Sequence, residues 1–554
     1  MKKRLVSLML VMAMTMSVVL GGCGNSQKES SNSSDTSKVE STATQEKSSE
    51  SVASTEEKVE LEEKTIQVLL FGPGKQADSD KVWAQFNEML QEYVPNTTVE
   101  FTVVPTSEYK DNYNRMLAAE EAYDLTWVGY ATNLKTHMKD GDLMPLDDLL
   151  DEYGQGIKEA VTDEVLDIHR YSDGELYYVL SWQGLVGEKR AMYVPTEMVE
   201  IVEKEHPNWL AETQKAVSEW FNEGLSIRPV CEQLDKFFTT LRAEGINYYG
   251  FGKSSALQFL QYYELSQTRL IANQTGVGIK IGDPNFKAID TYTNEDYRIR
   301  CEYLAKWFQE GVIPSDIMSA SSSQFKFVEN GEYNENTVLF ACENLWVDSQ
   351  KLTYEAKAGV PLSFIPIEDQ GTLTPGSSTG MAIPYCADEP ERGMMVLNAL
   401  YTVPELYQLL VYGIEGTHYT KNADGTITHV GLASSSSPYG LNNWYFGTCE
   451  NGFATDAGQL TFYDDLKEAE ATLYKNPFVN FVYDNSKTKD VIAALDAIGT
   501  EYNVQLRTGA FGKDWEAKFD EHLKLRKEAG IDRLIEDYQA QLDAYMKENN
   551  ITSW

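Results

Sequence analysis

The first part of the chain alternates between two spacings of apolar residues, each typical of one kind of element. Residues 65–71 form a short apolar run that predicts a strand, whereas residues 82–93 place apolar side chains three and four positions apart, as a helix does. The alternation continues with a strand at 99–104, a helix at 109–122 and a strand at 123–130. This order predicts a parallel sheet with right-handed crossovers, and therefore an α/β fold.

A second α/β unit is expected to begin near Tyr193. Helical spacing recurs over residues 231–245 and 294–311, and residues 337–346 predict a strand that runs into a loop. The chain ends in two amphipathic helices, the last of which carries one apolar stripe made by Ile531, Leu534, Ile535, Tyr538, Leu542, Tyr545 and Met546. We expect this stripe to pack on its own domain.

The N-terminal residues have the order of a secretory signal. Three basic residues precede an apolar run over residues 5–20, and the small residues Gly21 and Gly22 lead to Cys23. The run is about 16 residues long, short of the roughly 20 that cross a bilayer. Leu20-Gly21-Gly22-Cys23 resembles the lipobox of bacterial lipoproteins, which implies that Cys23 carries a diacylglycerol. The alternative is a free or buried cysteine at the end of a signal peptide.

Residues 24–63 are rich in Ser, Thr, Glu and Lys and contain almost no large apolar side chains. Such a segment buries too little surface to offset its ordering entropy, so we expect a disordered tether that reaches roughly 35 Å. The remaining residues, 64–554, are enough for about two domains.

The net charge limits the class of partner, and the cysteine count limits the possible disulfide pairing. Asp and Glu number 85 against 47 Lys and Arg, a net charge of −38, which argues against nucleic acid and polyanionic ligands. If Cys23 is lipidated, the other five cysteines leave at least one unpaired, and the sequence does not assign their pairing. These five are Cys231, Cys301, Cys342, Cys386 and Cys449.

Catalytic and metal motifs find little support. Residues 376–380 match G-x-S-x-G, but a strand rather than a helix is predicted to follow, so a hydrolase nucleophile elbow is not expected. Gly252-Lys253-Ser254 lacks the upstream glycine of a phosphate loop, since residue 247 is Asn. The six histidines have no metal-ligand spacing, so no metal or cofactor is expected. A glycosidase carboxylate pair stays possible because acidic residues are abundant.

Aromatic residues gather where predicted strands end. Trp127, Tyr130, Trp182 and Trp346 stand where predicted strands end, and Trp444 lies in the loop-like segment 437–447. A sugar ring offers an apolar C–H face that packs on an indole or phenol, and a hydroxyl fringe that Asp, Glu, Asn and Ser bind. Core packing is the alternative for each aromatic residue, but as a set at the carboxyl ends of strands they favour a ligand cleft.

Several segments together resemble the family 1 extracellular solute-binding lipoproteins of ABC importers, the sugar-type group. They are Y123-D-L-T, G141-D-L-M-P-L-D-D-L-L, D173-G-E-L-Y-Y-V, F340-A-C-E-N-L-W, residues 392–419 and residues 528–545. The last of these is similar to the C-terminal domain of unknown function in the oligosaccharide-associated branch. The resemblance implies a type II periplasmic-binding-protein-like fold with two lobes, a hinge and extra C-terminal helices.

The resemblance also implies a domain plan. A signal peptide would span residues 1–22 and a tether 23–63; the first lobe would combine 64–184 with 366–412, and the second 185–365 with 413–554. We expect the chain to cross between the lobes near Trp182–Gly187, Pro361–Glu368 and Val411–Gly416, within about ten residues each. Carried over by position, Trp346 resembles the family's aromatic platform, and Trp127 and Tyr130 match the first-lobe loop. The expected ligand contacts are Trp127, Tyr130, Trp182, Phe251, Glu343, Trp346, Ser378 and Trp444.

Two residues depart from the family pattern. Cys342 and Glu343 stand where small residues are common, which leaves the hydrogen bonding at that strand end open. The resemblance implies a monomeric, non-catalytic receptor without cofactors, anchored by lipid at the extracellular face of the bacterial membrane. It would capture an oligosaccharide and deliver it to ABC permease subunits, with no nucleic acid partner. A peptide or another non-sugar solute in the same fold is one alternative, and a surface glycoside hydrolase is the other. The sequence does not identify the sugar.

Overall fold

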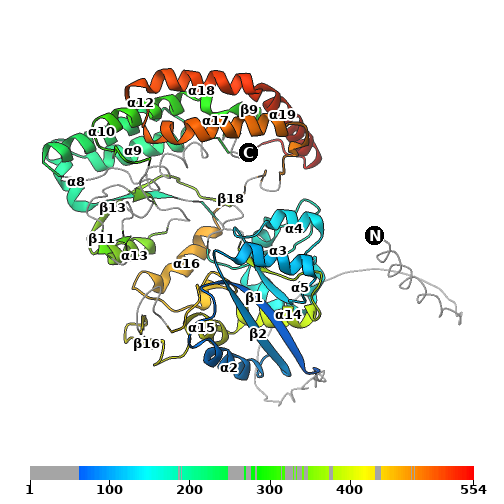
Figure 1. Cartoon of the computed structure of the whole chain (residues 1–554). Coiled ribbons are helices and arrows are strands. Elements are labelled where there is room, and N and C mark those ends of the chain that lie inside the picture. The colour runs from blue at the N-terminus through cyan, green and yellow to red at the C-terminus, as the bar shows by residue number, and fades with distance from the viewer. Residues whose placement is uncertain are drawn as a thin grey trace, which may run out of the picture. The chain divides into compact units, whose positions relative to one another are not determined.

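The structure is a computed structural model (Figure 1). It describes residues 61–184, 187–188, 190–246, 268–269, 276–280, 283–313, 315–318, 328–329, 332–333, 340–341, 347–373, 379–430, 438–475, 477–478 and 481–553. The expected signal peptide and most of the expected tether lie outside these residues.

The largest sheet has five strands in the order β2-β1-β3-β15-β4. Its strands are β1 (Lys64–Gly72), β2 (Thr97–Pro105), β3 (Leu125–Val128), β4 (Val179–Leu180) and β15 (Gly380–Ala382). β1 pairs in parallel with β2 and β3, as the alternating pattern predicts. β15 enters from much later in the chain and pairs antiparallel with both β3 and β4.

Helices cover this sheet and complete the first hydrophobic cluster. In β1 every residue from Val68 to Gly72 is buried, as expected for a strand covered on both faces. Val82, Phe86 and Leu90 recur every four residues on one face of α2 and pack in the same cluster. The helices of this part are α2 (Ser79–Leu90), α3 (Tyr109–Ala119), α4 (Leu134–Asp140), α5 (Asp147–Tyr153), α6 (Gln155–Ala160), α7 (Asp163–Asp167), α14 (Pro390–Thr402), α15 (Pro404–Tyr412) and α16 (Gln459–Glu470).

The first cluster also includes residues that lie beyond position 412, where the predicted first lobe ends. Tyr419, Ile427, Tyr439, Leu466 and Leu473 are all buried there. Two of them belong to the hairpin of β16 (Tyr419–Lys421) and β17 (Ile427–His429), whose turn holds Asp424-Gly425. The predicted lobe boundary at residue 412 therefore separates residues that pack together.

A second cluster surrounds the antiparallel sheet β12-β6-β13, made by β6 (Ala191–Pro195), β12 (Phe340–Ala341) and β13 (Leu362–Pro366). Large aromatic side chains fill it, among them Trp209, Trp220 and Trp307. Its helices are α8 (Thr196–Glu203), α9 (Trp209–Phe221), α10 (Arg228–Ala243) and α12 (Glu295–Gln309). Both α10 and α12 lie where helices are predicted.

The C-terminal helices are α17 (Lys489–Thr508), α18 (Trp515–Ala529) and α19 (Ile531–Glu548), which lie together in Figure 1. The apolar stripe of α19 packs with Val277 and Ile279 of β8 (Val277–Lys280), so the prediction that it serves its own domain is confirmed. β8 pairs with β7 (Thr268–Arg269) and β9 (Ala288–Asp290). The remaining elements are α13 (Ser349–Ala358), β10 (Val328–Glu329), β11 (Glu332–Tyr333), η2 (Thr291–Thr293), η4 (Cys449–Asn451), η5 (Asn485–Lys487) and η6 (Gly512–Asp514).

Three chain segments that connect the clusters pair with one another in a small sheet, which we call the hinge sheet. Its strands are β5 (Gly187–Glu188), β14 (Thr372–Leu373) and β18 (Tyr474–Lys475), in the order β18-β14-β5. The first two strands lie within about ten residues of predicted crossings. The third predicted crossing, Val411–Gly416, is wrong: Val411 and Tyr412 are buried in the first cluster, and the chain leaves it at β18 instead.

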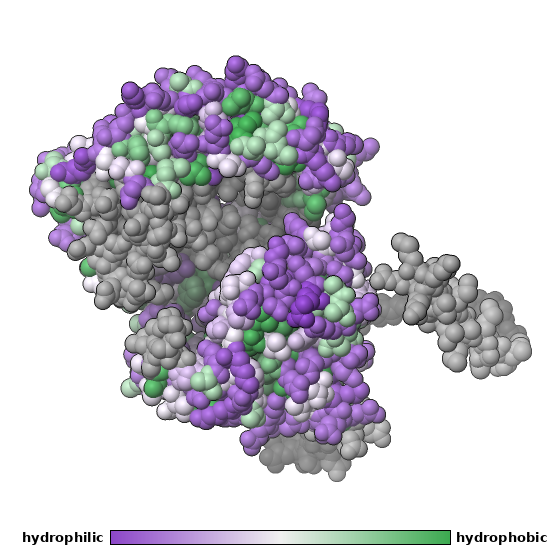
Figure 2. All heavy atoms as spheres, viewed as in Figure 1, coloured by the Kyte–Doolittle hydropathy of each residue, from purple (hydrophilic) through white to green (hydrophobic). Residues whose placement is uncertain are grey.

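Figure 2 shows that hydrophilic residues prevail over the described parts of the visible face, with smaller apolar patches between them. No single described helix has the length and apolar character to cross a membrane; only α14 and α15 taken together pass that test, and they meet at a bend of 91°. Most of their apolar residues are buried in the first cluster.

Candidate functional site

The candidate site lies at one edge of the five-stranded sheet. The carboxyl ends of the parallel strands β1 and β3 meet there, and the register that pairs Val128 with Gly380 brings the start of β15 to the same edge. β4 pairs antiparallel with β15, so its end lies there too. Ligands of such sheets bind at this edge.

Aromatic rings form a continuous cluster along the edge. The indole of Trp127 stacks on Phe71 with ring centroids 4.4 Å apart and meets Tyr130 edge-on at 5.7 Å. Trp444 approaches Trp127 at 6.3 Å and Tyr130 at 6.2 Å, and the T-shaped Tyr445 contact with Phe71 attaches the late loop to β1. The structure thus brings together three of the expected ligand contacts, Trp127, Tyr130 and Trp444.

These three residues differ in what they offer to a ligand. Tyr130 is 67% exposed and Trp444 is half-buried, whereas Trp127 has no exposed surface. Trp127 therefore supports the other two rings from beneath in this structure. Its indole N–H is buried without a hydrogen-bond partner among the described residues. We call the rings of Tyr130 and Trp444 the aromatic platform.

Glycine at position 129 lets the backbone approach Trp127, the support of the platform, closely. A Cβ there would come within 2.8 Å of the Trp127 ring and 2.9 Å of the Thr379 methyl group. Thr379 in turn accepts a 2.9 Å hydrogen bond from the Gln183 side chain. Gln183 and Thr379 were not expected at the site, although each directly follows a residue that was, Trp182 and Ser378.

Trp182 links the end of β4 to α16. Its indole N–H donates to a carboxylate oxygen of Glu470 at 3.2 Å, and the ammonium of Lys467 lies 5.5 Å from the ring centroid. Burial raises the pKa of the Glu470 carboxyl, while the Trp182 bond and Lys467 oppose that rise. Trp182 is only 2% exposed, so in this structure it is a buried contact between the end of β4 and α16, close in the chain to the hinge sheet.

The remaining expected site residues, Phe251, Glu343, Trp346 and Ser378, lie outside the described residues, as does the expected lipidation site, Cys23. Within the described part of the chain, no group of three or more His, Cys, Asp or Glu side chains is placed to hold a metal ion. The sheet edge therefore presents aromatic surface to a ligand, with amide and hydroxyl groups beside it.

Comparison with solved structures decides the fold. An N-glycan transport solute-binding protein (NgtS) from Streptococcus pneumoniae superposes with a TM-score of 0.67, at 17% identity, over 87% of this chain and 99% of that one. The chain has the fold of a solute-binding protein. The same protein in complex with Man1GlcNAc gives a TM-score of 0.60 at 17% identity over 87% and 99% of the two chains. The predicted two-lobed, type II fold is confirmed.

Two further proteins are similar to this chain, one in structure and one in sequence. An extracellular solute-binding protein from Bifidobacterium longum subsp. infantis gives a TM-score of 0.53 at 14% identity, over 87% of this chain and 98% of that one. A carbohydrate ABC transporter substrate-binding protein of Streptococcus pneumoniae is 24% identical over 284 residues, which cover 50% of this chain. That match spans about half the length of the relative, 55%.

Residues 477–547 match a family model described as a domain of unknown function (DUF3502). They contain α17, α18 and all of α19 except its last residue, so the resemblance of the C-terminal segment to such a domain is confirmed.

Proposed function

We propose that this protein is a solute-binding receptor of an ABC importer and that its ligand is an oligosaccharide. The observation that carries the proposal is the aromatic platform, in which the exposed Tyr130 and the half-buried Trp444 lie at the ligand-binding edge of the sheet. Apolar faces of sugar rings stack on such side chains, and neighbouring amides and hydroxyls bind the sugar hydroxyls. Complexes of NgtS with Man1GlcNAc and Man5GlcNAc support the same class of ligand.

The hinge sheet gives the proposal a conformational basis. Three two-residue strands join the clusters, and such short crossings can absorb a rotation of one lobe against the other. A ligand that contacts both lobes shifts the population toward a closed form, because it binds that form more tightly. The permease subunits would then recognise the closed form and receive the ligand unchanged.

We assign the ligand contacts on the first lobe to Tyr130 and Trp444, with Trp127 and Trp182 as supports. Phe251, Glu343, Trp346 and Ser378 remain proposed contacts. The proposed lobes keep their predicted core segments, 64–184 and 185–365. The packing of Tyr419, Leu466 and Leu473 favours residues 413–473 as part of the first lobe. We expect a monomer that catalyses no reaction.

We further propose that Cys23 carries lipid and holds the receptor at the extracellular face of the membrane. Two or more acyl chains give stable anchoring, whereas one alone is marginal. The test is a Cys23→Ala variant expressed in its bacterial host: the wild type should sediment with membranes and the variant should appear in the soluble or secreted fraction. Equal membrane retention of both forms would contradict the anchor and leave the ligand proposal untouched.

The ligand proposal is tested with a panel of neutral oligosaccharides and peptides in thermal unfolding. A ligand present at about 100 times its dissociation constant adds about 2.7 kcal/mol of stability, which is readily seen as a shift in unfolding temperature. We expect a shift with at least one oligosaccharide, no shift with peptides and no shortened sugar after long incubation. A shift with peptides alone, or release of cleaved sugar, would replace the proposal by one of its two alternatives.

A further inference from the structure

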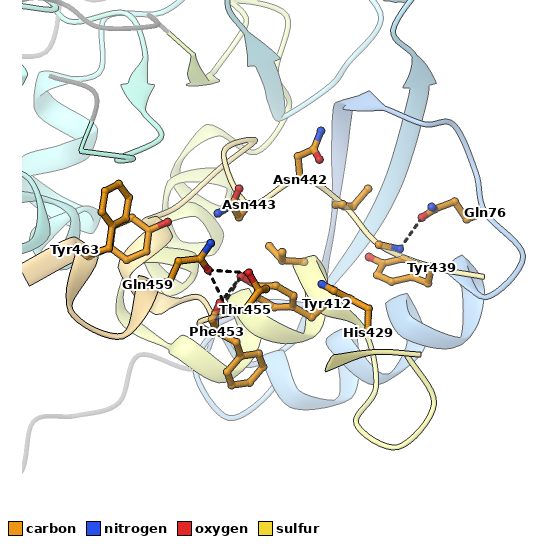
Figure 3. Close-up of a pocket in the computed structure, with 14 residues that line it drawn as sticks. Gln76, Tyr412, His429, Tyr439, Asn442, Asn443, Phe453, Thr455, Gln459 and Tyr463 are labelled. Atoms are coloured by element: carbon orange, nitrogen blue, oxygen red, sulfur yellow. Dashed lines mark hydrogen bonds between the residues drawn. The ribbon is translucent and has the colours of Figure 1, made fainter. Parts of the chain in front are cut away.

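A cavity lies within the first cluster, next to the aromatic platform but lined by other residues. Its volume is about 410 Å³, and it lies between α15, the start of α16 and the loop of residues 438–447 (Figure 3). Nothing in the proposed function uses it. Small-molecule sites have volumes of roughly 300–1,000 Å³, so the cavity has room for a ligand of about one sugar ring.

Aromatic rings form its walls, and their hydroxyl groups are bonded within the protein. Tyr439 donates its hydroxyl to the Leu410 carbonyl at 2.7 Å, and the Tyr412 hydroxyl accepts the Phe453 backbone N–H at 3.2 Å. Tyr412 and Phe453 contact each other with ring centroids 5.2 Å apart. Because these bonds hold the rings in place, the rings present fixed apolar surface to the cavity.

Two glutamine side chains lie on opposite sides of the cavity (Figure 3). The Gln76 oxygen accepts the Gly440 N–H at 3.0 Å, and the Gln459 oxygen accepts the N–H and hydroxyl of Thr455 at 2.9 and 3.0 Å. These bonds engage the oxygens only. Each side-chain NH₂ group has no bond to another described residue, so two oriented amide donors are available at the cavity.

The described residues that line the cavity include no Asp, Glu, Lys or Arg, although the chain as a whole holds 85 acidic and 47 basic residues. The imidazole of His429 has its pKa lowered by burial, which favours its neutral form. A charged ligand would find no counter-ion among these described lining residues. The lining is suited to a neutral molecule with an apolar face and several hydroxyl groups.

One loop serves both the cavity and the platform. In the segment 438–447, Trp444 and Tyr445 pack against Phe71 at the sheet edge, while Tyr439 and Asn442 line the cavity. The Asn442 amide donates a 3.0 Å hydrogen bond to the Tyr445 hydroxyl, which joins the two sides of the loop. The two sites are thus neighbours with separate side chains.

We propose that this cavity is a second carbohydrate site, which holds one neutral sugar unit between its aromatic walls and the amide donors of Gln76 and Gln459. The inference rests on the proposed function for the class of ligand only. It places a single ring in a site distinct from the aromatic platform, and so predicts binding of free monosaccharides that does not depend on Tyr130 or Trp444.

The test titrates the full chain with glucose, galactose, mannose and N-acetylglucosamine, each at millimolar concentrations, and detects binding by saturation-transfer NMR. Gln459→Trp places an indole into the cavity, and Thr461→Trp adds the same group at an exposed position of α16 outside the lining. Gln459→Leu removes only the amide and serves if the bulky variant misfolds. We expect saturable binding of at least one sugar, weakened about tenfold or more by the Gln459 variants, which is about 1.4 kcal/mol, and unchanged in Thr461→Trp.

A Tyr130→Ala/Trp444→Ala variant separates the two sites. We expect it to keep monosaccharide binding while its affinity for the oligosaccharide falls. Absence of saturable binding by all four sugars overturns the second site, as does binding that survives both Gln459 variants. If oligosaccharide binding through Tyr130 and Trp444 persists in either case, only this inference fails. If no oligosaccharide binds at all, the proposed function fails.

Discussion

The rings of Tyr130 and Trp444 lie with their centroids 6.2 Å apart and their planes inclined by 42°. Tyr130 follows β3, and Trp444 belongs to the loop of residues 438–447, which comes after the β16–β17 hairpin. The buried Trp127 contacts both rings. The platform therefore exists only because a late loop folds back onto the edge of an early sheet.

Removing either platform ring should weaken oligosaccharide binding. We expect Tyr130→Ala and Trp444→Ala each to reduce affinity about tenfold, because the stacking and apolar contact of one ring contribute about 1–1.5 kcal/mol. Isothermal titration with the oligosaccharide identified by the thermal screen measures the change. Tyr93→Ala is the matched control, since Tyr93 is 47% exposed on the same lobe and lies away from the platform. Equal affinities for all variants would remove the platform from the binding site.

A methyl group at position 129 should disturb the support of the platform. Gly129→Ala would place a Cβ within 2.8 Å of the Trp127 ring and 2.9 Å of Thr379, both of which are buried. Overpacking of this kind costs about 1–3 kcal/mol of unfolding free energy, and we expect a loss of ligand affinity besides. Chemical denaturation measures the first effect. Gly440→Ala is the control for stability, because the nearest atom to its added Cβ lies 4.0 Å away.

The buried pair Arg190 and Glu368 should be essential to the second lobe beside the hinge sheet. The Arg190 side chain donates to Glu368 at 2.6 Å, and both residues are 4% exposed. Glu368→Gln removes the carboxylate charge from this buried ion pair, so we expect a loss of about 3–5 kcal/mol in the free energy of unfolding. Asp151→Asn breaks the exposed pair with Lys158 and should leave the denaturation curve nearly unchanged. Similar curves for both variants would contradict this account.

Stability should fall on acidification because of His522. This residue is fully buried, and burial, followed by Arg526 and Arg507, lowers its pKa from 6.5 to about 3. Between these two values the unfolded chain binds a proton that the folded chain does not, so the free energy of unfolding falls as pH drops through this window and is unaffected by His522 above it.

The variant His522→Phe tests this linkage. Its ring can keep the stacked contact with Tyr502, where the centroids are 5.5 Å apart. Neither ring nitrogen of His522 has a hydrogen-bond partner among the described residues, so no such bond is lost. We expect the variant to equal or exceed the wild type at pH 7.5 and to gain on it steadily toward pH 4 in thermal unfolding. A constant difference across this range would show that His522 does not titrate as stated.

The sequence predicted some of the residues at the site, but not how they pack against one another. Tyr130 and Trp444 were expected at a ligand edge because they stand at strand ends and in a loop, and the structure brings them together there. The complete burial of Trp127 was not foreseen, since a strand-end position does not say what later packs over it. Gln183 and Thr379 were missed because their hydrogen bond joins residues far apart in the chain.

By itself the sequence determined the elements of β1 to β3 and their parallel order, because apolar spacing reports which face of each segment is buried and a strand–helix–strand order leaves few topologies. It likewise determined the apolar stripe of α19. Only the tertiary structure decided that β15 enters the sheet between β3 and β4, that the chain crosses at β18 rather than near Val411, and that residues 438–447 close over a cavity. Those features depend on contacts between distant segments, which leave no periodic pattern in either partner.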